Sequence, residues 1–348
     1  MSQKYEFGAA FTDHMITADW SLDQGWHDLQ MGPRREIPMD PGMVGLHYGQ
    51  VVFEGLKAHR GVDDSIALFR PAEHALRFQR SARRMSMPEL PVEIFVRACE
   101  ALTAADADQL PHDESLSLYL RPVLYASEAH LALRPAREYR FLLIAFVTQR
   151  FFAAQLNALT VWVSREYSRA MPGGTGGVKI AGNYAPTYLV QQLAAEQGCD
   201  QVVWTDSAEH KWVHELGGMN LFFVRGSGAD AQVVTPPTSD VVLPGITRSA
   251  LLALAEKHGW RTSEEEISVD QWRRECAEGI ITEVFACGTA AVVSPVGRVR
   301  DGEGDFDING GQVGPVTDAL HKELVAIQQG RAADPDGWRH VVPPNATL

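Results

Sequence analysis

The sequence predicts a mixed α/β (α+β) protein built from two domains. Its 348 residues are more than a single domain usually needs, and a hydrophobic content of 45% is enough for sizeable cores. Short apolar runs typical of strands alternate with longer segments that have the period of an α-helix. We expect a small α/β domain in residues 1–150, an interdomain linker in residues 151–160 and a large domain in residues 161–348.

In the first half of the chain, the patterns predict two helices and four strands. The helices are expected at residues 71–85, where Pro71 suits the first turn, and at residues 92–104. The strands are expected at residues 51–58, 65–69, 116–124 and 139–147.

In the second half, three predicted helices alternate with strands. One is expected at residues 185–197, where Gly198 ends it, and another at residues 247–258, with Thr247 as its N-cap. A final helix is expected at residues 315–329. The strands are expected at residues 159–164, 201–204, 220–224, 232–234, 280–286 and 290–293.

Charge and cysteine content argue against several classes of partner. A formal net charge of -13 opposes binding to nucleic acid or to an anionic membrane surface. No stretch approaches the roughly 20 apolar residues of a membrane helix, and residues 1–11 have no apolar signal core. None of the four cysteines is spaced for a metal site or a redox pair, so we expect no metal. We therefore expect a cytoplasmic enzyme or binding protein.

A glycine-rich segment at residues 173–177 leads to Lys179. It is not a phosphate loop, because Val178 separates the lysine from the last glycine and Ile180 stands where a serine or threonine should follow. Taken alone, the segment favours a lysine on the surface. The alternative is a partly desolvated amine, which is nucleophilic and able to form a Schiff base. Tyr184 is either a hydrogen-bond donor near this lysine or a core tyrosine.

Three further segments suit a charged ligand, and each also has a simpler interpretation. The amides at residues 244–247, ahead of a helix, suit a phosphate, although Thr247 alone indicates only an N-cap. Glu215 is either the partner of a protonated ring nitrogen or a solvated turn residue. The small residues 287–291 join two strands, where they either let amides approach an anion or form a packed turn.

Taken in order, these segments resemble the branched-chain amino-acid aminotransferases, which are fold-type IV enzymes that use pyridoxal 5'-phosphate. Residues 177–186 are similar to the family's cofactor-lysine motif. The resemblance covers nearly the whole chain and includes residues 7–8, 11–15, 46–48, 52–58, 68–71, 118–122, 198–202, 243–248 and 283–285. It implies a small α/β domain, a large mixed domain with a pseudo-barrel around the cofactor, and a site between the two.

The resemblance also implies how the cofactor is held. Lys179 would carry it as a Schiff base and move the proton at the substrate α-carbon. Glu215 would keep the pyridine nitrogen protonated, and Tyr184 would donate to the phenolic oxygen. The phosphate would be bound by Arg70, the amides of Ile246 and Thr247, and Thr289, with help from Arg169.

The implied reaction moves an amino group between L-leucine, L-isoleucine or L-valine and 2-oxoglutarate, giving branched-chain 2-oxo acids and L-glutamate. Arg121, with Tyr119, would bind the distal carboxylate of glutamate or 2-oxoglutarate. The pocket walls would be Tyr48, Phe53, Tyr119 and Tyr184. The substrate α-carboxylate would lie on the amides of Thr289 and Ala290, with help from Tyr48. The resemblance further implies a homodimer in which the loop after Pro122 closes the partner's pocket.

Two features depart from the family pattern. Ala291 and Ser294 stand where some members have a cysteine pair, so we expect no redox switch there. Gly218 replaces a threonine that is common in its turn, which removes one hydroxyl near the cofactor.

Two alternatives stay open. D-amino-acid aminotransferases and aminodeoxychorismate lyases share the fold, but Tyr48, Phe53, Tyr119 and Arg121 argue against them. A non-catalytic α/β binding protein, or a nucleotide enzyme that uses the glycine-rich segment, is the second alternative, and it would be colourless.

Overall fold

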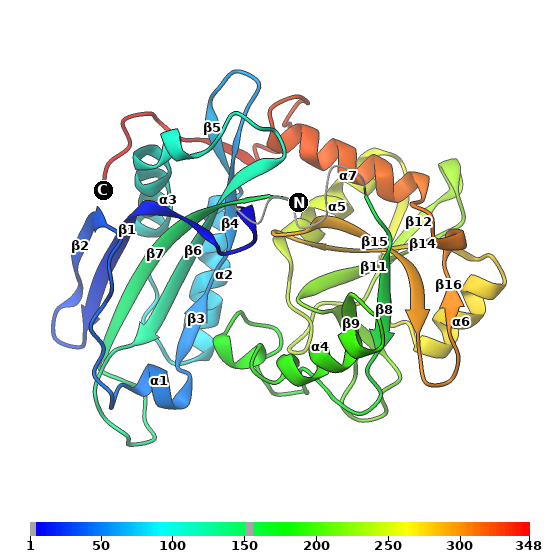
Figure 1. Ribbon diagram of the computed structural model, residues 1–348, viewed down its shortest axis with the longest axis horizontal. Helices are drawn as coiled ribbons and strands as arrows, with labels where there is room; N and C mark the ends of the chain where they lie inside the picture. Colours follow the sequence, from blue (N-terminus) through cyan, green and yellow to red (C-terminus); the bar gives the residue numbers. More distant parts are fainter. Residues whose placement is uncertain (1–4, 150–155) are drawn as a thin grey trace. The chain divides into compact units, whose positions relative to one another are not determined.

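The structure is a computed structural model that describes residues 5–149 and 156–348. It divides into two compact units (Figure 1). Unit 1 comprises Met1–Phe151, Val178–Gly182 and Ala326–Leu348, and unit 2 comprises Phe152–Gly177 and Asn183–Val325. The segment with Lys179 therefore belongs to unit 1. Within the predicted linker, residues 151–155 lie outside the described residues and residues 159–160 already begin a strand.

Unit 1 is built on one eight-stranded antiparallel sheet. Its strand order is β17-β5-β4-β6-β7-β1-β2, and β3 pairs with β6. The strands are β1 (Ala10–Ser21), β2 (Gly25–Pro33), β3 (Val51–Phe53), β4 (Leu56–Arg60), β5 (Ile66–Phe69), β6 (Leu116–Ala126), β7 (Glu138–Gln149) and β17 (Arg339–Val341). The C-terminal strand β17 thus completes a sheet made mainly by the first half of the chain.

Two helices of unit 1 pack against this sheet through a shared core. The helices of the unit are α1 (Val44–Tyr48), α2 (Pro71–Arg84) and α3 (Val92–Ala105), followed by a 3-10 turn at Ala107–Gln109. The ring of Phe78 of α2 contacts those of Phe95 of α3 and Phe141 of β7, and all three side chains are fully buried. Burying each such side chain contributes roughly 1.5–3 kcal/mol. This packing fixes α2 beside β3.

Unit 2 contains a closed six-stranded barrel, which confirms the expected pseudo-barrel. The strands follow the order β10-β9-β8-β15-β14-β11, and β11 pairs back with β10. The pairs β8–β9 and β8–β15 are parallel, and the others in the ring are antiparallel. The barrel strands are β8 (Leu159–Val163), β9 (Gln201–Thr205), β10 (Val213–Leu216), β11 (Met219–Arg225), β14 (Ile281–Gly288) and β15 (Val292–Arg300). Strands β12 (Gln232–Thr235), β13 (Arg261–Glu264) and β16 (Phe306–Asp307) extend it.

The helices of unit 2 are fixed by buried side chains and by caps. They are α4 (Thr187–Glu196), α5 (Ile246–Lys257), α6 (Val269–Ala277) and α7 (Pro315–Gln328), with 3-10 turns at Gly228–Asp230 and Asn309–Gly311. The last three residues of α7 are counted with unit 1, and a further 3-10 turn, Ala181–Asn183, lies where the chain passes from unit 1 into unit 2. Ser268 caps α6 by accepting the Gln271 N–H at 3.0 Å. The buried Glu283 accepts the N–H groups of Val316 and Thr317, at 3.0 and 2.8 Å, at the start of α7.

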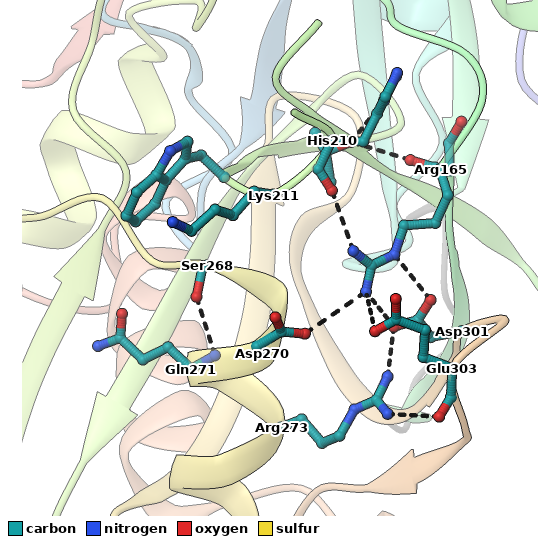
Figure 2. A network of polar contacts seen from close by, with 12 residues as sticks. Arg165, His210, Lys211, Ser268, Asp270, Gln271, Arg273, Asp301 and Glu303 are labelled. Carbon is teal, nitrogen blue, oxygen red and sulfur yellow. Dashed lines mark hydrogen bonds and ion pairs between the residues drawn. The ribbon is translucent and has the colours of Figure 1, made fainter. Parts of the chain in front are cut away.

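A network of ion pairs joins several loops of unit 2 (Figure 2). The carboxylate of Asp301, whose side chain is fully buried, accepts hydrogen bonds from Arg165 Nε at 3.0 Å and Nη2 at 2.7 Å. Arg273 of α6 pairs with the same carboxylate, and Arg165 Nη1 donates to the His210 carbonyl at 3.2 Å. The network thereby ties the segment after β8 to the turn that precedes β10.

Most predicted helices and strands are found within a few residues of their expected bounds, but the strand predicted at residues 51–58 is wrong as one element. Strand β3 ends at Phe53 and β4 begins at Leu56. A Cβ atom on Gly55 would lie 1.8 Å from the Tyr119 hydroxyl, so only glycine fits in this break. The strand predicted at residues 290–293 begins at Val292. No helix of the described residues is long and apolar enough to cross a membrane.

Candidate active site

Lys179 is held by its backbone within unit 1. Its N–H donates to Ser81 Oγ of α2 at 2.9 Å, and its carbonyl accepts the N–H of Phe53 at 3.1 Å. The next residue, Ile180, forms an isolated antiparallel bridge with Val52 of β3. Both peptide groups of the half-buried lysine are therefore fixed, on one side by a helix and on the other by a strand. This answers the question left open by the sequence: Lys179 is not a loose surface residue.

The ring of Phe53 contacts both Lys179 and Arg121. The family resemblance implies that Lys179 carries the cofactor and that Arg121 binds the substrate's distal carboxylate. Lys179 Nζ lies 4.7 Å from the ring centroid, and the guanidinium carbon of Arg121 lies 4.9 Å from it. Ring faces attract cations, by about 0.5–2 kcal/mol depending on exposure. Within unit 1, the structure thus brings together the predicted cofactor lysine, an apolar wall and the predicted carboxylate-binding arginine.

Arg121 lies among aromatic rings and keeps an unsatisfied donor. Its guanidinium carbon is 5.4 Å from the Tyr119 ring and 6.0 Å from the Phe7 ring, in addition to Phe53. Its Nε is buried and makes no hydrogen bond within the described residues. Buried donors are nearly always hydrogen-bonded, and guanidinium groups bind carboxylates strongly. The chemistry of this group therefore fits an acidic ligand.

Arg70 and Tyr48, also of unit 1, lie at helix ends. Arg70 is the N-cap of α2 with φ 53° and ψ 49°, a left-handed conformation that is uncommon for a residue with a side chain. Its guanidinium carbon lies 5.5 Å from the Trp338 ring, and its Nε is 3.3 Å from Glu73. Tyr48 ends α1, is 49% exposed, and donates its hydroxyl to the Leu131 carbonyl at 3.0 Å.

Glu215 is a buried, paired carboxylate in unit 2. It lies within strand β10, which corrects the expectation that it lies in the turn between two strands. Its Oε2 is 2.8 Å from Arg169 Nη2, and its Oε1 accepts the Leu243 N–H at 2.7 Å and Asn220 Nδ2 at 3.4 Å. A buried charge is tolerated only with such partners. The simpler interpretation of Glu215 as a solvated turn residue is therefore wrong.

The helix predicted to bind a phosphate is α5, and its first turn differs from the expectation. The helix begins at Ile246 after Gly245, so Thr247 lies inside the first turn and is not the N-cap. The N-cap residue, Gly245, has no side chain with which to cap the helix. A Cβ on Gly245 would lie 1.9 Å from Asn220 Oδ1, so the glycine is required. A helix N-terminus without a side-chain cap suits a phosphate group.

The glycine-rich segment serves close packing within unit 2. A Cβ on Gly176 would lie 2.8 Å from the Val241 backbone, and one on Gly177 would lie 2.4 Å from the Ser239 carbonyl. Gly177 also donates its N–H to the Asp240 carbonyl at 2.7 Å. The segment is thus packed on residues 239–241, just ahead of Leu243 and α5. This close packing explains Gly176 and Gly177 without a bound nucleotide.

The remaining predicted residues lie in or near two turns of the barrel. Tyr184 follows the 3-10 turn Ala181–Asn183. A Cβ atom on Gly218 would lie 3.9 Å from the hydroxyl oxygen of Tyr184. A Cβ atom at position 218 would therefore be in ordinary van der Waals contact with Tyr184. Thr289 and Ala290 form the turn between β14 and β15. In the barrel, Cys287 of β14 pairs with Asn220 of β11, so this turn neighbours the β10–β11 turn with Gly218.

The sequence alone did not reveal the residues that hold the predicted ones in place, among them Asn220 and Ser81. Asn220 Nδ2 bridges Glu215 and the Leu243 carbonyl, at 3.4 and 2.9 Å. Because Glu215 and Asn220 are paired across the β10–β11 hairpin, recognising that hairpin would have predicted their contact. No local signal in the sequence marks Ser81.

Comparisons with known proteins show the family to which the chain belongs. The model of the family "Amino-transferase class IV" matches residues 51–299. The chain is 50% identical over 333 residues to the branched-chain-amino-acid aminotransferase of Mycolicibacterium smegmatis, covering 95% of this chain and 90% of that one.

Two solved structures of branched-chain amino acid aminotransferases are also similar to this chain. The branched-chain amino acid aminotransferase of Escherichia coli matches with a TM-score of 0.79 and 25% identity, covering 95% of this chain and all of that one. A T.th. branched-chain amino acid aminotransferase complexed with N-(5'-phosphopyridoxyl)-L-glutamate matches with a TM-score of 0.75 and 26% identity, covering 94% of this chain and 98% of that one. On these grounds, the chain belongs to the class IV aminotransferase family.

Proposed function

We propose that this protein is a pyridoxal-phosphate-dependent branched-chain amino-acid aminotransferase. It transfers the amino group between L-leucine, L-isoleucine or L-valine and 2-oxoglutarate. The observation that carries the proposal is the contact of one aromatic ring, that of Phe53, with both Lys179 and Arg121. A cofactor lysine and a hydrogen-bond donor for a carboxylate then share an apolar wall, as a site for both substrates requires.

The side chains present suit pyridoxal 5'-phosphate. Lys179 would carry the cofactor, Glu215 would accept the hydrogen bond of its ring nitrogen, and Tyr184 would donate to its phenolic oxygen. Its phosphate would be held by Arg70, by the first amides of α5 at Ile246 and Thr247, and by Thr289. When bound, the cofactor supplies an electron sink that weakens the bonds at the α-carbon of the amino acid.

Glu215 and Lys179 have complementary tasks in the reaction. The Arg169 pair and the Leu243 N–H support an ionised Glu215, which can keep a nearby ring nitrogen protonated. Lys179, fixed through its backbone, can accept a proton at Nζ and return it. The role of Arg169 is therefore to hold Glu215, and we do not propose that it binds the phosphate.

The substrate side chain is accommodated by aromatic faces with a polar edge. Phe53 and Tyr119 offer apolar surface to a branched aliphatic group, and Arg121 offers its unsatisfied Nε to the distal carboxylate of glutamate or 2-oxoglutarate. An apolar pocket separates aliphatic side chains that differ by one methylene by only about 1–3 kcal/mol. All three branched-chain amino acids should therefore react. The α-carboxylate would bind the amides of Thr289 and Ala290, with Tyr48 nearby.

We further propose that the protein is a cytoplasmic homodimer. Leu46, Tyr48, Leu131 and Leu133 are exposed apolar side chains on α1 and on the loop that follows β6. The Tyr48 hydroxyl bonds to this loop at Leu131, so these residues are neighbours. Exposed apolar residues that gather in one place suit a protein interface. All four cysteines are free thiols, as expected in a reducing compartment.

A donor panel and an absorption spectrum test the function. Purified protein with 2-oxoglutarate should turn over L-leucine, L-isoleucine and L-valine, and should leave D-alanine unchanged. The protein should be yellow, its visible band should shift on addition of L-leucine, and Lys179→Ala should be colourless. Turnover of D-alanine alone would favour a D-amino-acid aminotransferase, and a colourless wild type would contradict the proposal as a whole.

A further inference from the structure

One face of helix α2 presents polar side chains to the segment of Lys179. His74, Arg77 and Ser81 are spaced by three and four residues, so they lie on one side of the helix. Ser81 Oγ accepts the Lys179 N–H at 2.9 Å and donates to the Arg77 carbonyl at 3.0 Å. Helix α2 therefore contacts the lysine directly, through a hydroxyl that is itself fully buried.

The other two polar residues of this face bind one carboxylate, that of Glu54. Arg77 donates from Nε and Nη2 to the two oxygens of Glu54, at 2.6 and 2.9 Å, and His74 Nδ1 lies 2.7 Å from Oε2. Glu54, His74 and Arg77 are all buried, with 0%, 1% and 5% exposure. Glu54 directly follows Phe53, whose N–H and ring both contact Lys179. We call these three residues the Glu54 cluster.

The charge of Lys179 acts on the Glu54 cluster through His74. Burial alone would raise the pKa of Glu54, but Arg77 and His74 hold it well below its usual range, so the carboxylate is ionised. Burial lowers the pKa of His74, Glu54 raises it, and the charges of Arg77 and Lys179 lower it further. With a neutral imidazole, the cluster carries one negative and one positive charge.

Charged groups surround the Lys179 segment on several elements of unit 1. Helix α2 carries His74, whose charge interacts with that of Lys179, and also Arg77 and Arg80, whose charges interact with Glu54, the residue after β3. Strand β6 carries Arg121, across the Phe53 ring. The three arginines are permanent cations, and Glu54 is the anion that pairs with Arg77. Without Glu54, Lys179 would face an excess of positive charge.

We propose that Glu54 is a positioning residue that sets the electrostatic potential at the Lys179 amine by neutralising Arg77, and that α2 fixes this lysine through Ser81. The inference rests on the proposed function, because it takes Lys179 as the residue that carries the cofactor. Its consequence is that a neutral residue 54 leaves the Arg77 charge uncompensated. The protonated form of the lysine–cofactor linkage then becomes less favourable.

The electrostatic part is tested by titrating the visible band of the holoenzyme with pH. In Glu54→Gln the midpoint should fall by roughly one pH unit, as expected for one uncompensated charge nearby. In the double variant Glu54→Gln/Arg77→Met both charges are gone, so the midpoint should return to within about 0.3 units of wild type. Asp19→Asn is the matched control, because it also breaks a two-bond arginine pair, with Arg140, in unit 1.

An unchanged midpoint in Glu54→Gln, or a double variant that stays as low as the single one, would overturn the electrostatic part. If Glu54→Gln does not fold, Arg77→Met decides, because it leaves the Glu54 charge uncompensated and should raise the midpoint. An unchanged midpoint in Arg77→Met would then overturn the electrostatic part.

The mechanical part is tested at Ser81 by the rate at which apo-protein takes up pyridoxal phosphate. Ser81→Ala leaves the Lys179 N–H without its acceptor, and we expect uptake about tenfold slower, as for one lost hydrogen bond. Ser81→Thr keeps the hydroxyl and should restore the rate. Ser117→Ala is the control, because Ser117 is buried in the same unit and its Oγ makes no hydrogen bond within the described residues.

Equal uptake rates in Ser81→Ala and Ser117→Ala would overturn the role of Ser81. Different results would contradict the proposed function and the present inference. A wild type without a pH-dependent visible band contradicts the proposed function, whereas a normal wild-type band that Glu54→Gln does not shift contradicts only the present inference.

Discussion

Lys179 and Phe53 are in contact at two points: the Phe53 N–H donates to the Lys179 carbonyl at 3.1 Å, and Lys179 Nζ lies 4.7 Å from the centroid of the Phe53 ring. The backbone bond sets where the lysine segment lies along β3, and the ring contact sets where its amine lies. Because Arg121 contacts the same ring, the residue proposed to carry the cofactor and the residue proposed to bind the substrate carboxylate share one aromatic neighbour.

Arg121→Met should change KM for 2-oxoglutarate much more than KM for L-leucine. The methionine keeps apolar contact with the rings but cannot bind a carboxylate, so KM for 2-oxoglutarate should rise by about tenfold to a hundredfold. KM for L-leucine should stay within about threefold of wild type, since this substrate has no distal carboxylate. Steady-state kinetics of both half-reactions measures the difference.

Arg34→Met is the control for this variant. Arg34 also lies over an aromatic ring, with its guanidinium carbon 5.1 Å from the Phe11 centroid, but it is exposed. It should leave both KM values unchanged. Equal rises for 2-oxoglutarate and L-leucine in Arg121→Met would show that the arginine shapes the pocket without recognising the carboxylate.

Glu215→Gln should keep the yellow colour and lose most turnover. The glutamine can still accept the Leu243 N–H, but it carries no charge to hold a ring nitrogen protonated. We expect kcat to fall by about a hundredfold or more. Glu275→Gln is the matched control, because Glu275 also pairs with an arginine of unit 2, Arg225, at 2.9 Å. Full activity of Glu215→Gln would refute the role of this carboxylate.

The secondary structure could be predicted where the apolar periodicity of the sequence is strong. Prediction failed where contacts between residues distant in sequence determine the structure. Helices α2 and α3 were expected within a residue of their bounds, because their buried faces repeat with the helical period. Strands β1 and β2 were not predicted, since polar residues are mixed into both. Between β3 and β4, Gly55 packs against Tyr119, which is distant in sequence. The domain bounds at residues 150 and 161 stay a prediction.

The candidate site could be predicted only through the resemblance. The residues alone favoured a surface position for Lys179, because no local pattern reveals that Ser81 and Phe53 bind its backbone. For the same reason the sequence did not reveal the pairing of Glu215 with Arg169, which are 46 positions apart in the numbering of the chain. Contacts of this kind are set by tertiary structure. The residue roles themselves stay predictions until variants are measured.

Asp301→Asn should destabilise unit 2 strongly. The carboxylate is fully buried and pairs with both Arg165 and Arg273, as Figure 2 shows. The two arginine side chains are 27% and 28% exposed, so they keep part of their hydration, and the loss of their charge-assisted hydrogen bonds should cost about 1–3 kcal/mol. Urea denaturation measures the loss. Asp305→Asn, whose side chain is 41% exposed and at least 3.6 Å from its arginines, should cost about 0–1 kcal/mol. Similar losses in both variants would contradict the stabilising role of Asp301.

Asp206→Asn should change how stability depends on pH. Burial would raise the pKa of Asp206, but the N–H groups of Glu209, Trp212, Lys211 and Ala208 lower it to about 2 from an ordinary value of 3.8. The ionised carboxylate therefore stabilises the fold above pH 3.8, and this contribution is lost as the pH falls towards about 2. The stability difference between wild type and variant should shrink over this window. A difference that is constant across it would contradict the assignment.

The central claim is that Lys179 carries the cofactor. Reduction of the holoenzyme with borohydride, followed by peptide mapping, tests it most directly. The account predicts a single modified peptide that contains Lys179 and the residues around it. Modification of another lysine, or of none, would contradict it.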